Sequence, residues 1–331
     1  MERFALAAAV VLGFALTAAL CSLFVPLRRV LERREQQQQP VQSEQPRPAP
    51  LRAPLWGGLC AAAGTVAAVG VGWLAACVGQ PELLGSEGRL MTRLLTALAG
   101  SLAFGAVGLA EDLARMRSPA ALGLRRDVRL LLEALAAAFV LLLLRAAGCL
   151  PRGLGVPGAG YVLLGSAVPF LWAVLMVALA ECARIAERDE GAVCGAAFVA
   201  MLALMMVEAG LGVSGLAVLP AALAGALVAL GLWAFPPARL GAGCCGSLLA
   251  AGAIGCIPLS LDMTSLTVPL ALPFWAAGGL LAAQLLCAKR TGKPLRCWVK
   301  KHKMSPETVF LCSFALSAVG YVLALALLRW C

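Results

Sequence analysis

The amino-acid sequence predicts an all-α polytopic membrane protein with about ten transmembrane helices. The chain of 331 residues is 61% hydrophobic and only 13% charged, whereas a typical soluble domain carries about 25% charged residues. Its mean hydropathy is +0.90. Most of the apolar residues fall in runs of roughly 18 to 24 residues, which is the length that a helix needs to cross a hydrocarbon core about 30 Å thick.

The apolar runs follow one another along the whole chain, and each predicts one membrane-spanning helix. Transmembrane β-strands would be about ten residues long with alternating polarity, and no run in the sequence alternates in this way. Pro169 and Pro258 interrupt two of the runs, and a proline in the interior of a helix weakens it. The predicted helices are 4–27, 55–78, 90–110, 128–147, 160–180, 191–209, 212–234, 244–261, 266–288 and 307–328.

The distribution of basic residues predicts the orientation of these helices. With the N-terminus outside, the inner loops hold 21 of the 27 Lys and Arg residues, in agreement with the positive-inside rule. Ten spans return the C-terminus to the outside as well. The net charge of +10 is therefore mainly a topology signal with some attraction to anionic membrane lipid, and no nucleic-acid partner is expected.

No polar segment is large enough to form a soluble domain, so residues 1–331 are expected to form a single membrane domain. A cleaved signal peptide is the alternative for the first apolar run. That run is too long for a typical signal core, and an arginine cluster follows it directly, so a retained anchor is expected. Residues 32–54 are rich in Gln and Pro and predict a low-complexity cytoplasmic loop without a packed core.

Ionisable side chains gather beside the predicted inner ends of the helices. Such residues are costly next to a membrane and are therefore candidates for function. Each group alone has a simpler interpretation as a solvated loop or a lipid-headgroup anchor. Their convergence predicts a pocket for an anionic, lipid-adjacent substrate, in which carboxylates would hold Mg²⁺. The cytoplasmic loops expected to form this site are 111–127, 181–190, 235–243 and 289–306.

Thirteen cysteines are present, but no CxxC pair recurs at metal-ligand spacing, so no cysteine metal site is expected. Cys244 and Cys245 are adjacent in the segment GAGCCGSLL, residues 241–249. A redox or nucleophilic pair is one interpretation of this segment. However, no base stands beside the pair in the sequence, and adjacent cysteines form a strained disulfide.

Five short segments carry a resemblance to a known family. They are PLWGG (54–58), FGAVGLAEDL (104–113), GLRRDVRLLLE (123–133), AERDEGAVCG (186–195) and GCCGSL (243–248). In this order they resemble the motifs of phospho-N-acetylmuramoyl-pentapeptide transferase and the wider polyprenyl-phosphate N-acetylhexosamine-1-phosphate transferases. The resemblance implies a ten-helix enzyme that uses Mg²⁺ to transfer a sugar-1-phosphate from a UDP-sugar to a polyprenyl phosphate, releasing UMP.

The resemblance also implies roles for individual residues. Glu111 and Asp112 stand at paired aspartates of the family and are the implied catalytic residues. Glu187 and Glu190 stand at two further aspartates, and with Asp112 they are the implied metal ligands. The implied substrate-binding residues are Arg129, Gly57, Gly58, Gly191, Gly246, Ser247 and His302.

Several departures from the family pattern argue against the family's chemistry. Cys244 stands where the family has an aspartate that binds Mg²⁺. A thiol is mostly protonated at neutral pH, and its thiolate is a soft ligand that suits Mg²⁺ poorly. Three aspartates appear as the longer glutamates 111, 187 and 190, Glu181 and Arg184 replace two asparagines, and at most His302 is left of a histidine triplet.

The sequence therefore predicts a divergent, catalytically impaired or inactive homologue in the inner (plasma) membrane of a bacterial cell. It would act in cell-envelope synthesis by binding or by partnering another membrane protein, with a homodimer as the alternative assembly. Polyprenyl phosphate and a UDP-sugar are the expected ligands. One alternative is an active transferase with a glutamate-substituted Mg²⁺ site. A membrane transporter is the other, but it would place charges or broken helices near the middle of the membrane.

Overall fold

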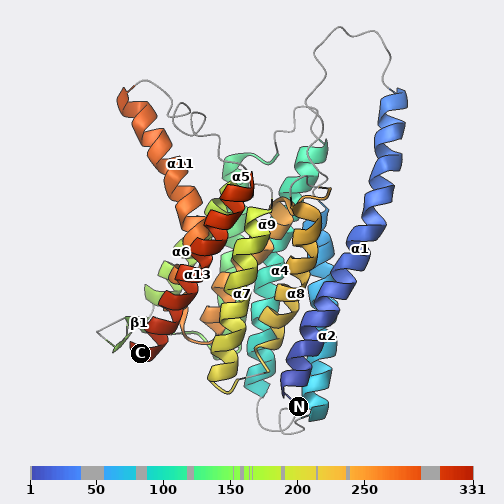
Figure 1. The fold of residues 1–331 in the computed structure, drawn as a ribbon. Helices are drawn as coiled ribbons and strands as arrows, with labels where there is room; N and C mark the ends of the chain where they lie inside the picture. Colours follow the sequence, from blue (N-terminus) through green and yellow to red (C-terminus); the bar gives the residue numbers. More distant parts are fainter. Residues whose placement is uncertain are drawn as a thin grey trace.

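The computed structural model confirms an all-α polytopic membrane protein (Figure 1). It describes residues 2–38, 56–79, 88–117, 123–151, 153–156, 160–163, 165, 167–187, 191–213, 215–235, 239–291 and 306–330. Within this part of the chain, seven helices are long and apolar enough to cross a membrane, or eight if one bent pair counts as a single span. The predicted total of ten spans and their inside–outside orientation stay predictions.

The long helices run roughly parallel in one bundle, with both chain ends at its lower end in Figure 1. An even number of crossings would produce this arrangement. The opposite end, where α4 ends and α9 begins, is called the site end below. The long helices are α1 (Glu2–Gln38), α2 (Gly57–Gly79), α4 (Gly88–Arg117), α5 (Arg126–Ala146), α6 (Ala167–Ala186), α7 (Ala192–Gly210), α8 (Val218–Ala234), α9 (Gly243–Ser260), α11 (Leu272–Thr291) and α13 (Pro306–Trp330).

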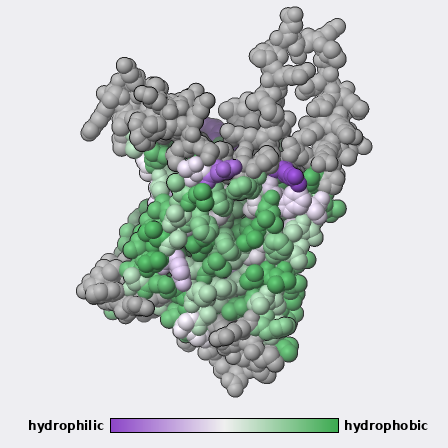
Figure 2. Space-filling view, viewed as in Figure 1, coloured by the Kyte–Doolittle hydropathy of each residue, from purple (hydrophilic) through white to green (hydrophobic). Residues whose placement is uncertain are grey.

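Helix α9 lies at the centre of the bundle, and all of its residues are buried. Its sequence GCCGSLLAAGAIGCIPLS is rich in small side chains, which allow neighbouring helices to approach closely. Helices α4, α6 and α2 pack around it. Figure 2 shows an almost continuous hydrophobic surface over the outer helices, with hydrophilic residues along the site end.

Three predicted helices differ from the observed elements. The run 160–180 begins with a strand, because β1 (Gly153–Val156) and β2 (Gly160–Leu163) form an antiparallel hairpin before α6. The prediction of helix there was wrong, whereas Pro169 is tolerated because it lies in the first turn of α6. The run 266–288 is not one straight helix: α10 (Thr267–Leu270), preceded by a 3₁₀ turn at Thr264–Leu266, meets α11 at a 64° bend. The run 212–234 forms helix only from Val218.

The helices also extend into segments that the sequence predicts to be loops. Helix α1 has 37 residues and reaches Gln38, inside the predicted loop 32–54, whose remainder lies outside the described residues. Helix α4 continues to Arg117, and α6 continues to Ala186. As a result, Glu111, Asp112 and Glu181 stand on rigid helices, so their side chains are held by helix packing.

The crossing of α2 and α9 depends on a glycine contact, which yields the first prediction. A Cβ atom at Gly58 would overlap the backbone of Ala242 and Gly246, whereas a Cβ atom at Gly70 on the same helix would meet nothing. We expect Gly58→Ala to lower the free energy of unfolding by about 1–3 kcal/mol through overpacking. Thermal unfolding of the detergent-solubilised protein measures this, with Gly70→Ala as the matched control. Equal melting temperatures for both variants would contradict the packing role.

Candidate functional site: a carboxylate and arginine cluster at one end of the bundle

Four helices bring the charged residues of the site together. Glu111 and Asp112 lie in the last two turns of α4 and are only 3% and 1% exposed. Arg129 lies in the first turn of α5 and is also buried. Glu181 lies near the end of α6, and Glu187 is the first residue after that helix. The first residues of α9 complete the cluster.

Asp112 binds the N-terminus of α9 with both carboxylate oxygens. Oδ1 accepts a hydrogen bond from the backbone N–H of Cys244 at 3.1 Å, and Oδ2 accepts one from Cys245 at 2.9 Å. The first N–H groups of a helix have no partner within the helix, and a negative charge is stabilised at this end. Gly108, one turn earlier on α4, lets the α9 backbone approach closely. Asp112 therefore joins α4 to α9.

Arg115 links three carboxylates at the end of α4. Its guanidinium lies 3.1 Å from Glu111 Oε1, 3.9 Å from Asp112 Oδ1 and 3.7 Å from Glu187 Oε2. Glu111 and Asp112 precede Arg115 by four and three residues, which places all three on one face of the helix. Glu187 reaches the same cation from the end of α6.

A second group of ion pairs connects α5 with α6. Glu181 accepts from Arg129 Nε at 2.7 Å with Oε1 and from Arg184 Nη2 at 2.6 Å with Oε2. Arg129 also lies 3.7 Å from Glu111 Oε1, which joins this group to the cluster around Arg115. We call the combined set the ion-pair cluster; its members are Glu111, Asp112, Arg115, Arg129, Glu181, Arg184 and Glu187.

The ion-pair cluster includes three residues that the sequence did not single out as catalytic, metal-ligating or substrate-binding. They are Arg115, Glu181 and Arg184, of which the last two lie in the predicted site loop 181–190. The i, i+3 and i, i+4 spacing of Arg115 from two acids was a usable signal. The contact between Arg129 and Glu181, which are 52 residues apart, could not be predicted from residue spacing along the chain.

Some buried polar atoms beside the cluster lack a hydrogen-bond partner among the described residues. They are Glu111 Oε2, Arg184 Nε and both carboxylate oxygens of Glu133. Glu133 is fully buried on α5, one turn after Arg129. Buried polar groups normally have partners, so these atoms mark the part of the site that is best suited to bind water or a polar ligand group.

The described residues do not fit the Mg²⁺ that the family resemblance implies. Among them, in the arrangement that has Arg115 between the acids, no three His, Cys, Asp or Glu side chains are grouped closely enough to hold a metal ion. Both oxygens of Asp112 accept amide hydrogen bonds, while Glu111 and Glu187 face the Arg115 guanidinium. The predicted ligand Glu190 lies outside the described residues.

Cys244, which the resemblance aligns with an aspartate ligand of the family, is buried in the first turn of α9. Cys244 and Cys245 are both free thiols. Their backbone N–H groups donate hydrogen bonds to Asp112, and their two side chains are packed inside the bundle. The segment GAGCCGSLL therefore forms the start of α9 beside Asp112. Gly243 is the first residue of the helix and has a φ of 66°, a backbone conformation that favours glycine.

The predicted substrate-binding residues of α2 and α9 take part in helix packing. The Gly57 N–H donates to the Gly241 carbonyl at 3.2 Å, and Gly58 lies against Gly246. Ser247 is buried, and its hydroxyl donates to the Cys244 carbonyl at 3.1 Å. Gly191 precedes α7 with a φ of 77°. Their predicted binding roles stay predictions, and His302 lies outside the described residues.

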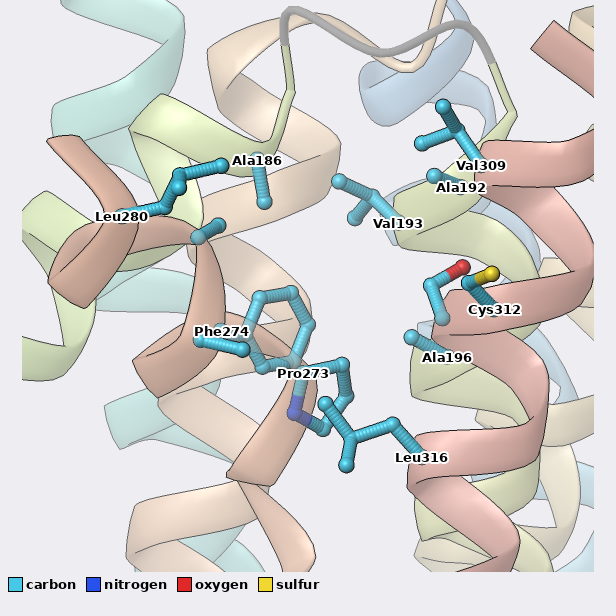
Figure 3. Close-up of a pocket in the computed structure, with 13 residues that line it drawn as sticks. Ala186, Ala192, Val193, Ala196, Pro273, Phe274, Leu280, Val309, Cys312 and Leu316 are labelled. Atoms are coloured by element: carbon cyan, nitrogen blue, oxygen red, sulfur yellow. The ribbon is translucent and has the colours of Figure 1, made fainter. Parts of the chain in front are cut away.

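An apolar groove extends from the site end between α6, α7, α11 and α13 (Figure 3). Its volume is about 220 Å³, and it reaches Ala186 and Ala192, which flank the segment carrying Glu187. Phe274, Pro273 and Leu316 line its deeper part. The groove is thus nearly free of polar side chains. Two of its lining residues, Ala186 and Ala192, are close in sequence to Glu187 of the ion-pair cluster.

The apolar helices are those of a multi-pass membrane protein, and the family of the chain follows from its sequence match. A family model described as glycosyl transferase family 4 matches residues 94–262, which is more than half of the chain. The chain therefore belongs to glycosyl transferase family 4, a family of polyprenyl-phosphate sugar-1-phosphate transferases. The match includes Glu111, Asp112, Arg129 and Cys244. No curated protein matches the chain.

The bond between Asp112 and α9 generates the second prediction. Asp112→Asn keeps the size of the side chain but leaves one acceptor oxygen for two amide donors, and it removes the negative charge. We expect the free energy of unfolding to fall by about 1–3 kcal/mol, which thermal unfolding in detergent measures. Asp127→Asn, at an exposed acid on α5, serves as the control. An unchanged midpoint in Asp112→Asn would show that the helix does not depend on this carboxylate.

Proposed function

We propose that this chain is a catalytically impaired or inactive member of its family. In this proposal it retains binding of a polyprenyl phosphate and acts through that binding or through a partner membrane protein of cell-envelope synthesis. The proposed setting is the inner membrane of a bacterial cell. The observation that carries the proposal is that the described carboxylates at the family's catalytic positions are already bound to arginines and backbone amides.

The chemistry of sugar-phosphate transfer explains why this arrangement is unfavourable for catalysis. Transfer between phosphates needs concentrated positive charge on the pyrophosphate, which a bound metal ion supplies at several kcal/mol of transition-state stabilisation. Each 1.36 kcal/mol lost from that stabilisation reduces the rate tenfold. Asp112 is committed to α9, and Cys244 offers a buried thiol in place of a carboxylate. Fewer of the oxygen ligands that Mg²⁺ prefers are therefore available at this site.

Binding of a polyprenyl phosphate does not require the stabilisation of a transition state that catalysis requires. Two features of the structure support such binding. Arg115 and Arg184 keep 23% and 16% of their side chains exposed, and arginine is well suited to phosphate. The groove beside α7 offers an apolar surface for part of a polyprenyl chain. A lipid in that groove would place its phosphate toward the end of the bundle at which the arginines lie.

The third prediction concerns transfer activity. Purified protein in detergent, supplied with undecaprenyl phosphate, Mg²⁺ or Mn²⁺ and a panel of UDP-sugars, should release no UMP above the background without protein. An active member of the family, assayed in parallel, shows that the conditions support transfer. Metal-dependent UMP release that Asp112→Asn abolishes would overturn the proposal in favour of an active transferase with a glutamate-substituted site.

The fourth prediction concerns lipid binding in the groove. Ala196 lies on its α7 wall, so Ala196→Phe would fill space that the lipid chain needs. We expect the affinity for undecaprenyl phosphate to fall by about tenfold, which equals about 1.4 kcal/mol, as measured by binding of radiolabelled lipid. Ala209→Phe, at an exposed position of the same helix, should bind as the wild type does. Equal affinities for both variants would place the lipid elsewhere.

A further inference from the structure

Arg115 occupies a position between carboxylates of two helices that would suit a bound cation. Glu111 and Asp112 reach it from α4, and Glu187 reaches it from the end of α6, at 3.1–3.9 Å. The side chains of Glu111 and Asp112 are only 4% and 1% exposed, so water screens their negative charges poorly. Without a cation at this point, three carboxylates would repel one another at the end of a buried helix.

The contacts of Arg115 go beyond those of an ordinary pair along one helix. Such an i, i+4 pair contributes only about 0.2–0.5 kcal/mol. Here Glu187 adds a contact from another element, and Arg129 approaches Glu111 from α5. A guanidinium has five N–H donors in a fixed plane and stays protonated, so one side chain can serve several carboxylates at once.

We infer that Arg115 supplies the positive charge for which a family site of this kind would use a divalent cation, so that this site excludes the metal and binds a phosphate group without it. The ligand class in this inference rests on the proposed function, whereas metal exclusion does not. Arg115 is attached to the same helix as two of its acids, so it is always present at the site, whereas a metal ion would have to displace it. The Arg115 side chain keeps 23% of its surface exposed.

Binding of Mn²⁺ to the purified full-length protein tests the inference directly. The electron paramagnetic resonance signal of free Mn²⁺ falls when the ion binds, so the measurement needs no catalytic activity. We expect no saturable Mn²⁺ site in the wild type. We expect about one site per chain in Arg115→Ala, with an affinity at least about tenfold higher than any binding by the wild type, because Glu111, Asp112 and Glu187 then lack the positive charge that Arg115 holds between them.

Two further variants control for charge and for folding. Arg117→Ala removes one positive charge from an exposed residue of the same helix and should leave Mn²⁺ binding unchanged. Arg115→Lys keeps a cation in place and should still exclude Mn²⁺. If Arg115→Ala is not monodisperse, Arg115→Gln removes the charge at similar side-chain length. A wild type that binds Mn²⁺ as tightly as these neutral variants overturns the inference, as does a folded neutral variant that binds no Mn²⁺.

The phosphate half of the inference has its own measurement. Wild-type protein should bind undecaprenyl phosphate equally well in EDTA and in Mg²⁺, and Arg115→Gln should lose at least several-fold in affinity under both conditions. Lipid binding that requires Mg²⁺ overturns the inference. These outcomes are distinct from failure of the proposed function, because UMP release without a Mn²⁺ site would overturn only the proposed impairment, and a Mn²⁺ site without UMP release would overturn only the role of Arg115.

Discussion

The two hydrogen bonds from the α9 N-terminus to Asp112 are the contact on which the site depends. Helix α9 is buried along its whole length, so its first N–H groups cannot reach water and need an acceptor from the protein. Asp112 supplies both oxygens. The same contact brings a buried negative charge into the bundle, and burying a charge is costly unless it is compensated. The position of Arg115 beside it follows from that requirement.

The ion-pair cluster extends this compensation to α5 and α6. Glu111 lies between Arg115 and Arg129, and Glu181 lies between Arg129 and Arg184. Removing one member would leave its partners as buried charges without compensation, which costs more than the pair contributes when intact. The cluster therefore holds the ends of three helices in one arrangement, and the same acids are less available to a metal ion.

Much of the fold could be predicted from hydropathy, because an apolar run of about 20 residues has few alternatives to a membrane helix. Glu111 and Asp112 could be selected as candidates from sequence, since they lie at the predicted end of an apolar run and resemble a family motif, and the structure places both in the ion-pair cluster. The hairpin at 153–163 was missed, because its glycines and apolar residues resemble part of a membrane run. The bend between α10 and α11 was missed as well, because hydropathy is continuous across it and only packing against neighbouring helices sets the angle.

The sequence by itself determined that this chain crosses a membrane many times and carries acids and arginines at the ends of its helices. These properties follow from composition and spacing, which act locally. Only the tertiary structure decided which charges pair. Asp112 meets amides 132 and 133 residues away, and Arg129 meets Glu181 52 residues away. Such partners are fixed by the packing of α4, α5, α6 and α9, because an ion pair depends on distance in space, which residue spacing along the chain does not encode.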